Sequence, residues 1–271
     1  MNVSQLFSKL WEQYVQESPE ALEIYNKFVE FGEEVVNDHI AFRTFDDPRI
    51  NVEQLAIHFE KLGYEVKGEY TFESKCLRAK HFEHKIDPKQ PKVFISELTT
   101  SKFSQYLQDK VKECTDRIPQ SLLGTAELLY SGAIWANLDY EVYQKLLAES
   151  EYAAWLYVFG FRANHFTVYI NELKKLDTIE KVNEFLKENE FTLNTAGGEI
   201  KGTPEELLEQ SSTMANKVPV KFSQGTYEIL NSFYEFAKRY PQTDGSIYQG
   251  FIAKSADKLF ESTYVGGQFY L

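Results

Sequence analysis

The sequence predicts an α+β protein in which a unit of one strand, one helix and three further strands occurs twice. A short histidine-containing run, Asn37–Phe45, returns in altered form at Ala163–Ile170. Each run precedes a stretch with the spacing of an amphipathic helix, and strand-like segments follow that stretch. These observations predict two βαβββ modules, residues 37–98 and 161–240, with helices before and between them.

Composition and charge describe a single globular domain, residues 1–271. Hydrophobic residues make up 43% of the chain and aromatic residues 15%, which is enough for an ample core. The net charge of −12 argues against nucleic-acid binding, because that needs clustered Lys and Arg. Cys76 and Cys114 offer no disulfide framework. With no recognisable signal peptide or membrane span, we expect a cytoplasmic protein without a protein partner.

Helices are predicted at the beginning of the chain, over residues 1–36. Leu6 and Leu10 belong to an apolar series at helical spacing. Ser18-Pro19 is typical of a new helix start, because serine caps the first turn and proline suits its first position. Two helices are therefore expected before the first module.

The first module begins where the period changes. The run from His39 to Arg43 suits a strand, and Pro48 lies just beyond its end. Val52–Leu62 has one apolar face and predicts a helix that ends at Gly63. Three further strands are predicted at Tyr64–Tyr70, Cys76–Phe82 and Lys92–Leu98.

The second module is predicted to repeat this order after a mostly helical insertion at residues 99–160. It opens with a strand at His165–Ile170 and a helix at Asp177–Asn189. Later strands are predicted to start at Phe191 and to lie near Ala215–Phe222 and Ser232–Arg239. Two such modules separated by helices are the architecture of the vicinal oxygen chelate class, in which two half-barrels enclose one metal ion.

Strand alternation points to a polar pocket between the modules. It places His39 and Arg43 on one face of the first strand and His165 on the matching face of the second. A single histidine on a half-apolar strand is more often a hydrogen-bonded core residue than a ligand. Two at equivalent positions of a repeat shift the balance towards a metal site. Arg43 could also simply pair with Asp38 or with a carboxylate in the core.

A carboxylate is needed as well, and the last predicted strand of each module supplies one, Glu97 and Glu235, at positions that we expect to be equivalent in the repeat. Two histidines and one carboxylate with open positions are the facial arrangement of non-haem Fe(II) enzymes. Glu235 stands between two aromatic residues and is the expected ligand beside His39 and His165. Glu97 remains open as a fourth ligand, a partner of a ligand or a surface residue.

At these residues the chain resembles the 2-oxoadipate dioxygenase/decarboxylase family, also called 2-hydroxyglutarate synthases. The resemblance implies an Fe(II) enzyme with a vicinal-oxygen-chelate-like core. It covers most of the chain, from about residue 37 to the end. The matching blocks are Asp38–Phe45, Asn164–Thr167, Tyr234–Arg239 and Ser255–Thr263.

The resemblance also implies roles for individual residues. Arg43 would hold a substrate carboxylate, and both histidines of the repeat would touch the substrate. Ser255 would contact the substrate from a tail, residues 241–271, that closes the pocket. The metal ligands implied by the resemblance are His39, His165 and Glu235.

The reaction implied by the resemblance consumes dioxygen and turns 2-oxoadipate into 2-hydroxyglutarate and carbon dioxide, a step of lysine catabolism. Two other functions stay open at this point. A non-redox isomerase or lyase of the same fold commonly uses four protein ligands and would call on Glu97. A metal-free protein that binds a small acidic or aromatic ligand is the second alternative.

Overall fold

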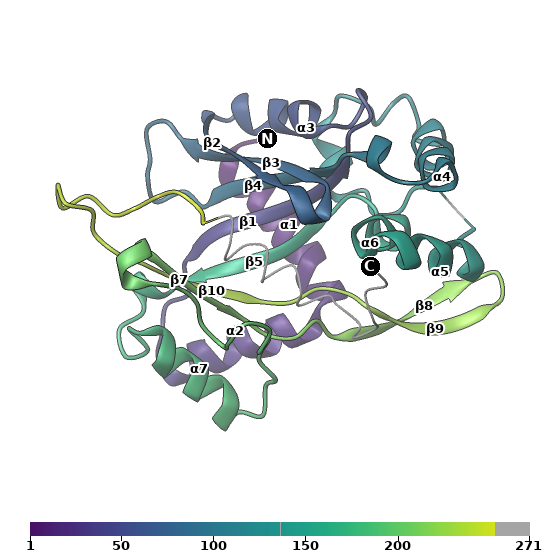
Figure 1. Ribbon diagram of the computed structural model, residues 1–271. Helices are drawn as coiled ribbons and strands as arrows, with labels where there is room; N and C mark the ends of the chain where they lie inside the picture. Colours follow the sequence, from purple (N-terminus) through teal and green to yellow (C-terminus); the bar gives the residue numbers. More distant parts are fainter. Residues whose placement is uncertain (136, 253–271) are drawn as a thin grey trace.

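An eight-stranded sheet and seven α-helices organise the described part of the chain, residues 1–135 and 137–252 of a computed structural model (Figure 1). The strands are β1 Asn37–Phe45, β2 Tyr64–Phe72, β3 Leu77–His84, β4 Lys92–Leu98, β5 Ala163–Tyr169, β6 Lys201–Thr203, β7 Leu208–Ser212, β8 Lys217–Phe222, β9 Gly225–Leu230 and β10 Glu235–Arg239. The helices are α1 Val3–Glu17, α2 Pro19–Phe31, α3 Val52–Glu60, α4 Gln105–Asp116, α5 Tyr140–Glu149, α6 Glu151–Phe159 and α7 Ile179–Glu188.

The order of strands across the sheet is β2-β3-β4-β1-β5-β10-β7-β6, so the two modules meet where β1 pairs with β5. The first half of this order comes from the first module and the second half from the second. β8 and β9 form a separate two-stranded ribbon. In Figure 1 the ribbon runs below α5 and away from the sheet.

The first module forms as the sequence predicts. β4 pairs parallel with β1, while β3 is antiparallel to both β4 and β2. α3 packs against β2 and β4. Its first turn is capped by the side chain of Asn51, and it buries Leu55 and Phe59 against the sheet.

The two N-terminal helices are also confirmed. Asn2 caps α1 together with Gln5, and Pro19 occupies the first turn of α2. α2 ends at Gly32, whose φ of 92° lies in the left-handed region that favours glycine. α1 packs on β5, where the ring of Tyr14 lies 5.0 Å from that of Phe166. These helices therefore cover the outer face of the junction between the modules.

The second module keeps the predicted frame of β5 and α7 but differs in its later strands. The strand expected at Phe191 is reduced to a single bridge between Leu193 and Thr213. The strand expected at Ala215–Phe222 forms, but it belongs to the ribbon and not to the sheet. The alternation of residues in this segment indicates a strand with one exposed face. It does not indicate which strand it pairs with.

β7 is a strand of the sheet that the sequence did not predict. Its sequence, Leu208-Glu209-Gln210-Ser211-Ser212, has little apolar character, yet all five residues are buried. Polar residues of this kind are normally taken for a loop. Here β7 lies between β6 and β10, and its side chains find polar partners inside the protein.

The pairing of β1 with β5 reveals an internal twofold relation. The two strands run antiparallel, with His39 opposite Thr167 and Ala41 opposite His165. If His39 corresponds to His165 and Ala41 to Thr167, exchanging the strands converts one pair into the other. The two histidines therefore occupy equivalent positions of a duplicated unit.

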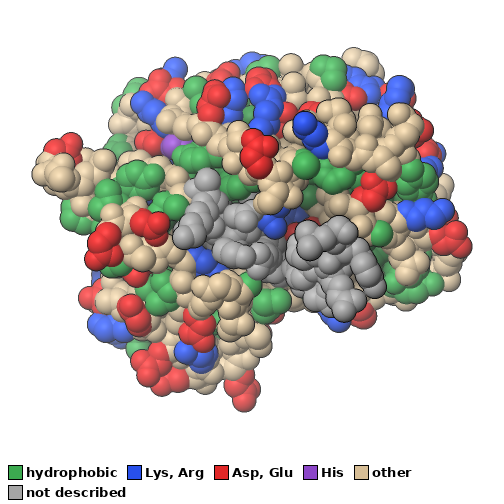
Figure 2. All heavy atoms as spheres, viewed as in Figure 1, with side chains coloured by type: hydrophobic (Ala, Val, Ile, Leu, Met, Phe, Trp, Pro, Cys, Tyr) green, Lys and Arg blue, Asp and Glu red, His purple; other side chains and the backbone are tan. Residues whose placement is uncertain are grey.

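The helices α4, α5 and α6 lie in the chain between the two modules, and α6 packs against β1. α6 is buried from Tyr152 to Phe159. None of the helices that the structure describes is both long and apolar enough to cross a bilayer. Figure 2 shows acidic and basic side chains interspersed over one face of the protein. This pattern agrees with a solvated surface rather than with a charged binding face.

Candidate metal centre

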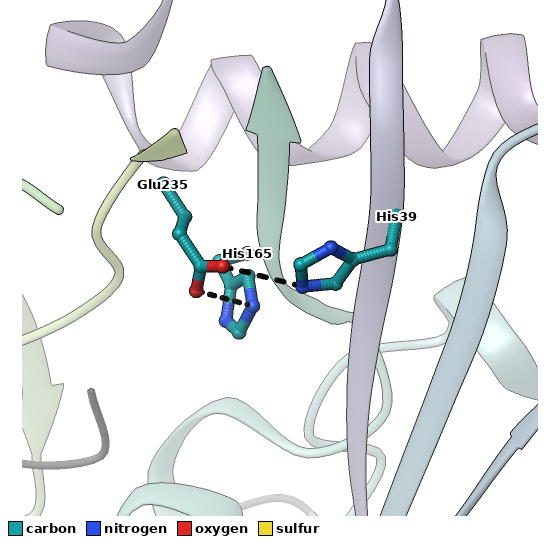
Figure 3. Close-up of side chains that lie close together, drawn as sticks. All are labelled: His39, His165 and Glu235. Carbon is teal, nitrogen blue, oxygen red and sulfur yellow. Dashed lines mark ion pairs between the residues drawn. The ribbon is translucent and has the colours of Figure 1, made fainter. Parts of the chain in front are cut away.

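Three buried side chains from adjacent strands converge between the modules (Figure 3). His39 of β1, His165 of β5 and Glu235 of β10 are 3%, 7% and 1% exposed. Their ligand atoms all lie within 4.8 Å of one another. The Glu235 carboxylate is 3.4 Å from His39 Nε2 and 3.3 Å from His165 Nε2. The structure thus brings together the three residues that the sequence predicted as metal ligands.

Each of the two histidines is oriented by the residue before it. Asp38 Oδ1 lies 2.8 Å from His39 Nδ1, and Asn164 Oδ1 lies 3.0 Å from His165 Nδ1. An oxygen acceptor at Nδ1 keeps the proton on that nitrogen and leaves the lone pair on Nε2. Both Nε2 atoms face Glu235, so both imidazoles are in the tautomer that a metal ligand needs.

The electrostatics of the three residues favour a bound cation. Burial, together with His39 and Arg43, holds the pKa of His165 well below its ordinary value, so this imidazole is neutral. Burial raises the pKa of Glu235, although His39 and a hydrogen bond from Gln210 oppose the change. A divalent cation at this point would offset the cost of keeping the buried carboxylate charged.

The positions of the donor atoms also fit a metal ion. His165 Nε2 is buried and makes no hydrogen bond to any described residue, an arrangement that is costly unless another partner is present. Two ligands about 2.1 Å from a metal and at right angles to each other lie about 3 Å apart. The two nitrogen–oxygen separations of 3.4 and 3.3 Å are close to that value. The donor set of two imidazoles and one carboxylate suits a first-row transition metal.

Arg43 lines a cavity that also borders the three ligands. It is 2% exposed, and its guanidinium lies 5.0 and 5.1 Å from the ring centres of Tyr152 and Trp155 in α6. Burial lowers its pKa and Glu151 partly offsets this, but an arginine stays charged at physiological pH. A charge in this place can hold a carboxylate.

Aromatic rings form much of the remaining cavity wall. Phe233 stacks on His165 with the ring centres 4.6 Å apart, and Phe251 meets His39 edge-on at 4.8 Å. Phe251 belongs to the tail, residues 241–271, that was predicted to close the pocket. Ser255 and the other residues of that tail from 253 onward lie outside the described residues.

Gln210 is a site residue that the sequence did not reveal. It is 2% exposed, lines the cavity and donates from Nε2 to Glu235 Oε1 at 2.6 Å. It reaches Glu235 because β7 pairs with β10 in a register that sets Gln210 opposite Ala237. The local sequence around Gln210 shows only a run of polar residues, in a region where no strand was predicted. Glu235, the partner of Gln210, lies far along the chain.

Glu97, by contrast, is not brought to the three ligands. Its carboxylate accepts a hydrogen bond from the backbone N–H of Val52 at 2.8 Å and another from Arg78 Nε. Val52 is the first residue of α3, so Glu97 satisfies a helix N-terminus on the helix-covered face of the sheet. Glu97 therefore contributes neither a fourth ligand nor a partner of a ligand.

The strand register explains why the expected symmetry between Glu97 and Glu235 is wrong. Phe94 stands beside Ala41 of β1, and Glu235 stands beside Thr167 of β5. Phe94 is therefore the counterpart of Glu235. Glu97 follows Phe94 by three residues, an odd number, and so points to the opposite face of the sheet.

Comparisons with known proteins find a matching family and several relatives. The chain matches the family described as 2-oxoadipate dioxygenase/decarboxylase over residues 2–244. A chloroplastic 2-oxoadipate dioxygenase/decarboxylase of Arabidopsis thaliana is 36% identical over 258 residues, which are 84% of this chain and 68% of the relative.

Two solved structures are close in both sequence and shape. The hydroxyglutarate synthase of Oryza sativa in complex with 2-oxoadipate has a TM-score of 0.89 and 32% identity, over 96% of this chain and 91% of that one. A Shewanella frigidimarina protein described as a presumptive hydrolase has a TM-score of 0.88 and 50% identity, over 93% and 98% of the two chains.

A more distant likeness concerns the fold. A Ralstonia eutropha protein assigned to the glyoxalase superfamily has a TM-score of 0.75 at 19% identity, over 93% of this chain and 86% of that one. This confirms the vicinal-oxygen-chelate-like core expected from the sequence. The family match spans most of the chain, and the curated relative has the name of an enzyme. The chain therefore belongs to the 2-oxoadipate dioxygenase/decarboxylase family of enzymes.

Proposed function

We propose that this protein is an Fe(II)-dependent dioxygenase/decarboxylase that converts 2-oxoadipate and dioxygen into 2-hydroxyglutarate and carbon dioxide. The observation that carries the proposal is the cluster of His39, His165 and Glu235 beside a cavity that Arg43 also lines. Family membership supports the reaction, and the related rice enzyme was crystallised with 2-oxoadipate.

The metal would be held by His39, His165 and Glu235, which come from three neighbouring strands and line the same cavity. This donor set is that of non-haem Fe(II) oxygenases. Bound there, Fe(II) would supply a place for the 2-oxo acid group and for the activation of dioxygen. Asp38 and Asn164 would keep the two imidazoles oriented for this task.

Arg43 would bind and orient a carboxylate of the substrate. It lies four residues after His39, with both side chains lining the same cavity. Arginine can form two parallel hydrogen bonds to a carboxylate, which fixes direction as well as position. The packing of Arg43 against Tyr152 and Trp155 limits its movement, so its charge is directed to one place in the cavity.

Phe94, Phe233 and Phe251 would exclude water from the reacting end of the substrate. A dry cavity strengthens the pairing of Arg43 with its carboxylate and limits side reactions. The overall change is balanced, since one 2-oxoadipate and one dioxygen give one 2-hydroxyglutarate and one carbon dioxide. No further reactant is needed.

The test is reconstitution with Fe(II) under anaerobic conditions, followed by addition of 2-oxoadipate and oxygen. The expected result is uptake of one dioxygen and release of one carbon dioxide per substrate consumed. Parallel reactions with 2-oxoglutarate and with 2-oxohexanoate, which lacks the distal carboxylate, would define the substrate. Failure to consume oxygen with any of them contradicts the proposal.

The same experiment separates the alternatives. A protein that binds metal but takes up no oxygen would be a non-redox enzyme. Glu97, the fourth ligand expected for such an enzyme, is instead bonded to Val52 and Arg78. A protein that retains no Fe, Mn, Ni or Zn after reconstitution would be a metal-free binding protein. The cytoplasmic location and the absence of macromolecular partners expected from the sequence stay predictions.

A further inference from the structure

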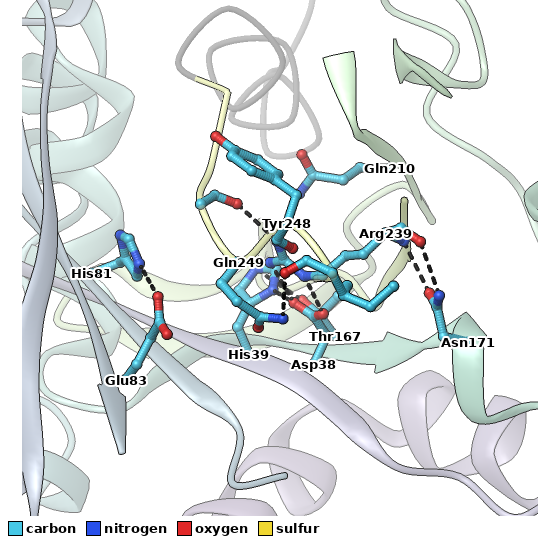
Figure 4. Close-up of polar contacts among 12 residues, drawn as sticks. Asp38, His39, His81, Glu83, Thr167, Asn171, Gln210, Arg239, Tyr248 and Gln249 are labelled. Atoms are coloured by element: carbon cyan, nitrogen blue, oxygen red, sulfur yellow. Dashed lines mark hydrogen bonds and ion pairs between the residues drawn. The ribbon is translucent and has the colours of Figure 1, made fainter. Parts of the chain in front are cut away.

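Arg239, the last residue of β10, is 1% exposed and lies beside Asp38, the residue before His39 (Figure 4). Its Nε and Nη2 donate to the two carboxylate oxygens of Asp38 at 2.6 and 2.9 Å. Asp38 is the residue whose Oδ1 holds Nδ1 of His39 at 2.8 Å. A chain of charged hydrogen bonds therefore leads from Arg239 to a predicted metal ligand.

The other edge of the same guanidinium is bonded to a different part of the chain. Nη1 donates to the carbonyl oxygens of Gly250 at 2.8 Å and of Tyr248 at 3.2 Å. Arg239 thus joins Asp38 to the segment Tyr248–Phe251 through a single planar group. The fork geometry of arginine allows this, and lysine cannot reproduce it.

The segment Tyr248–Phe251 returns to the metal site through its last residue. The ring of Phe251 meets His39 edge-on at 4.8 Å, and the guanidinium of Arg239 lies 5.2 Å from the centre of that ring. The backbone N–H of Phe251 also donates to the hydroxyl of Tyr70 at 3.2 Å. The segment is therefore held at two points, and its last residue, Phe251, forms part of the cavity wall.

Arg239 itself is fixed in place by Asn171. The side chain of Asn171 accepts from the backbone N–H of Arg239 and donates to its carbonyl oxygen, both at 2.9 Å (Figure 4). The guanidinium is consequently presented from a rigid backbone. If the segment leaves, Arg239 loses two acceptors and one aromatic neighbour, and its hold on Asp38 becomes looser.

We propose that Arg239 is a positioning residue that couples His39 to the segment Tyr248–Phe251 at the cavity wall. A metal ion that fixes His39 also fixes Asp38 and Arg239, and through them it orders the segment. Coupling between two sites is reciprocal, so a segment in place strengthens metal binding by the same factor. This inference rests on the proposed function only in requiring a metal at His39, His165 and Glu235.

The test uses Co²⁺ as a probe, because its visible absorption reports both binding and the geometry of the ligands. Hydrogen exchange of the amides of Tyr248 and Phe251 is measured with and without Co²⁺. Arg239→Lys keeps the charge but loses the fork. Arg78→Lys is the matched control, since the guanidinium of Arg78 also donates charged hydrogen bonds, here to Glu97 and Glu53, but lies on the other face of the sheet.

In the wild-type protein, Co²⁺ should slow exchange at Tyr248 and Phe251. In Arg239→Lys the affinity for Co²⁺ should fall by about 10- to 100-fold, the usual effect of losing a partner behind a metal ligand. The visible spectrum should change, and Co²⁺ should no longer slow exchange in the segment. Arg78→Lys should behave like the wild type in all three measurements.

Tyr70→Phe tests the link from the opposite end and leaves Arg239, Asp38 and His39 intact. It removes the hydroxyl that accepts the Phe251 N–H, so exchange in the segment should accelerate and the affinity for Co²⁺ should fall by a smaller factor of about 2 to 5. If Arg239→Lys does not fold, the measurements on Tyr70→Phe alone test the coupling.

Three results would overturn the coupling. The first is an Arg239→Lys protein that binds Co²⁺ within twofold of the wild type with the same spectrum. The second is a Tyr70→Phe protein whose segment exchanges faster while its affinity for Co²⁺ stays the same. The third is a wild-type protein that binds no Co²⁺. Oxygen uptake enters none of these measurements, so missing activity with 2-oxoadipate would contradict the proposed function and leave the coupling standing.

Discussion

Phe94 occupies in the first module the position that Glu235 occupies in the second. Each stands on a strand that runs parallel to a histidine-bearing strand, beside Ala41 and Thr167 respectively. The duplicated unit therefore carries a carboxylate on one side and an aromatic ring on the other. This difference leaves room for a substrate where a symmetric site would have a fourth ligand.

Restoring a carboxylate at Phe94 should convert the site to four ligands. We expect Phe94→Glu to bind metal more tightly than the wild type and to reduce oxygen uptake with 2-oxoadipate by at least about tenfold, because substrate access is lost. Phe94→Gln, which removes the ring without adding a charge, is the control. Metal titration and an oxygen electrode give both quantities, and undiminished uptake in Phe94→Glu would refute the idea.

Replacing His39 by Ala should abolish metal binding and remove the stabilisation that the metal provides. A metal at a hundred times its dissociation constant stabilises a folded protein by about 2.7 kcal/mol. Thermal unfolding with Fe(II) or Co²⁺, and again with a chelator, should therefore show a shift in the wild type and none in His39→Ala. His58→Ala, at a buried histidine of α3 outside the three-ligand cluster, is the control and should keep the shift.

Arg43→Lys should spare the metal and impair the substrate. The guanidinium lies on the cavity wall and not among the three ligands, so the metal titration should match the wild type. The loss of a paired, charged hydrogen bond should raise KM for 2-oxoadipate by about 10- to 100-fold. If KM stays within twofold, the substrate carboxylate is held by another residue.

Gln210→Leu should weaken metal binding through Glu235. The amide of Gln210 donates to Glu235 Oε1 at 2.6 Å, and leucine has a similar size but no donor. Partners of this kind typically change metal affinity by about 10-fold or more. Gln210→Glu would place a second carboxylate beside Glu235 and should raise the pKa of the pair. Equal metal affinity in Gln210→Leu and wild type would show that the hydrogen bond has no role in the site.

Glu33 provides a test of stability away from the site. Its carboxylate accepts hydrogen bonds from the backbone N–H groups of Lys174, Lys175 and Leu176 at 2.7 to 2.9 Å. Burial alone would raise its pKa, but these bonds outweigh burial and hold the pKa below its ordinary value. Since the folded protein favours the charged form, this stabilisation is present above the ordinary pKa of about 4.3 and is lost as pH falls through the lower, folded-state pKa.

Glu33→Gln should therefore lower the free energy of unfolding by about 1 to 3 kcal/mol at neutral pH. The difference from the wild type should shrink as the pH is lowered below about 4. Urea unfolding at several pH values measures this. A difference that does not change with pH would mean that the charge of Glu33 is unimportant.

The parts of the structure that follow from local pattern were predictable. The start of α2 at Ser18-Pro19 and the apolar spacing of α3 depend on neighbouring residues alone, although the side chain of Ser18 makes no capping hydrogen bond. The repeat of the histidine runs also predicted that His39 and His165 would be equivalent, because a duplicated sequence folds into a duplicated structure.

What could not be predicted depends on pairing between distant segments. The sequence near Ala215–Phe222 shows a strand but not that it leaves the sheet for a ribbon with β9. The error at Glu97 arose because strand register was unknown, and a shift of three residues reverses the face of a side chain. Gln210 was missed because its partner, Glu235, becomes visible only once β7 and β10 are paired.

The origin of the three ligands has a consequence for how the protein matures. His39 and its orienting Asp38 come from one module, while His165 and Glu235 come from the other. A chain still emerging from the ribosome, with residues 1–160 already folded, would have one of the two histidines and no carboxylate at this place. Metal binding would then follow completion of the β1–β5–β10 pairing, so a bound metal ion would stabilise the finished fold rather than guide its early stages.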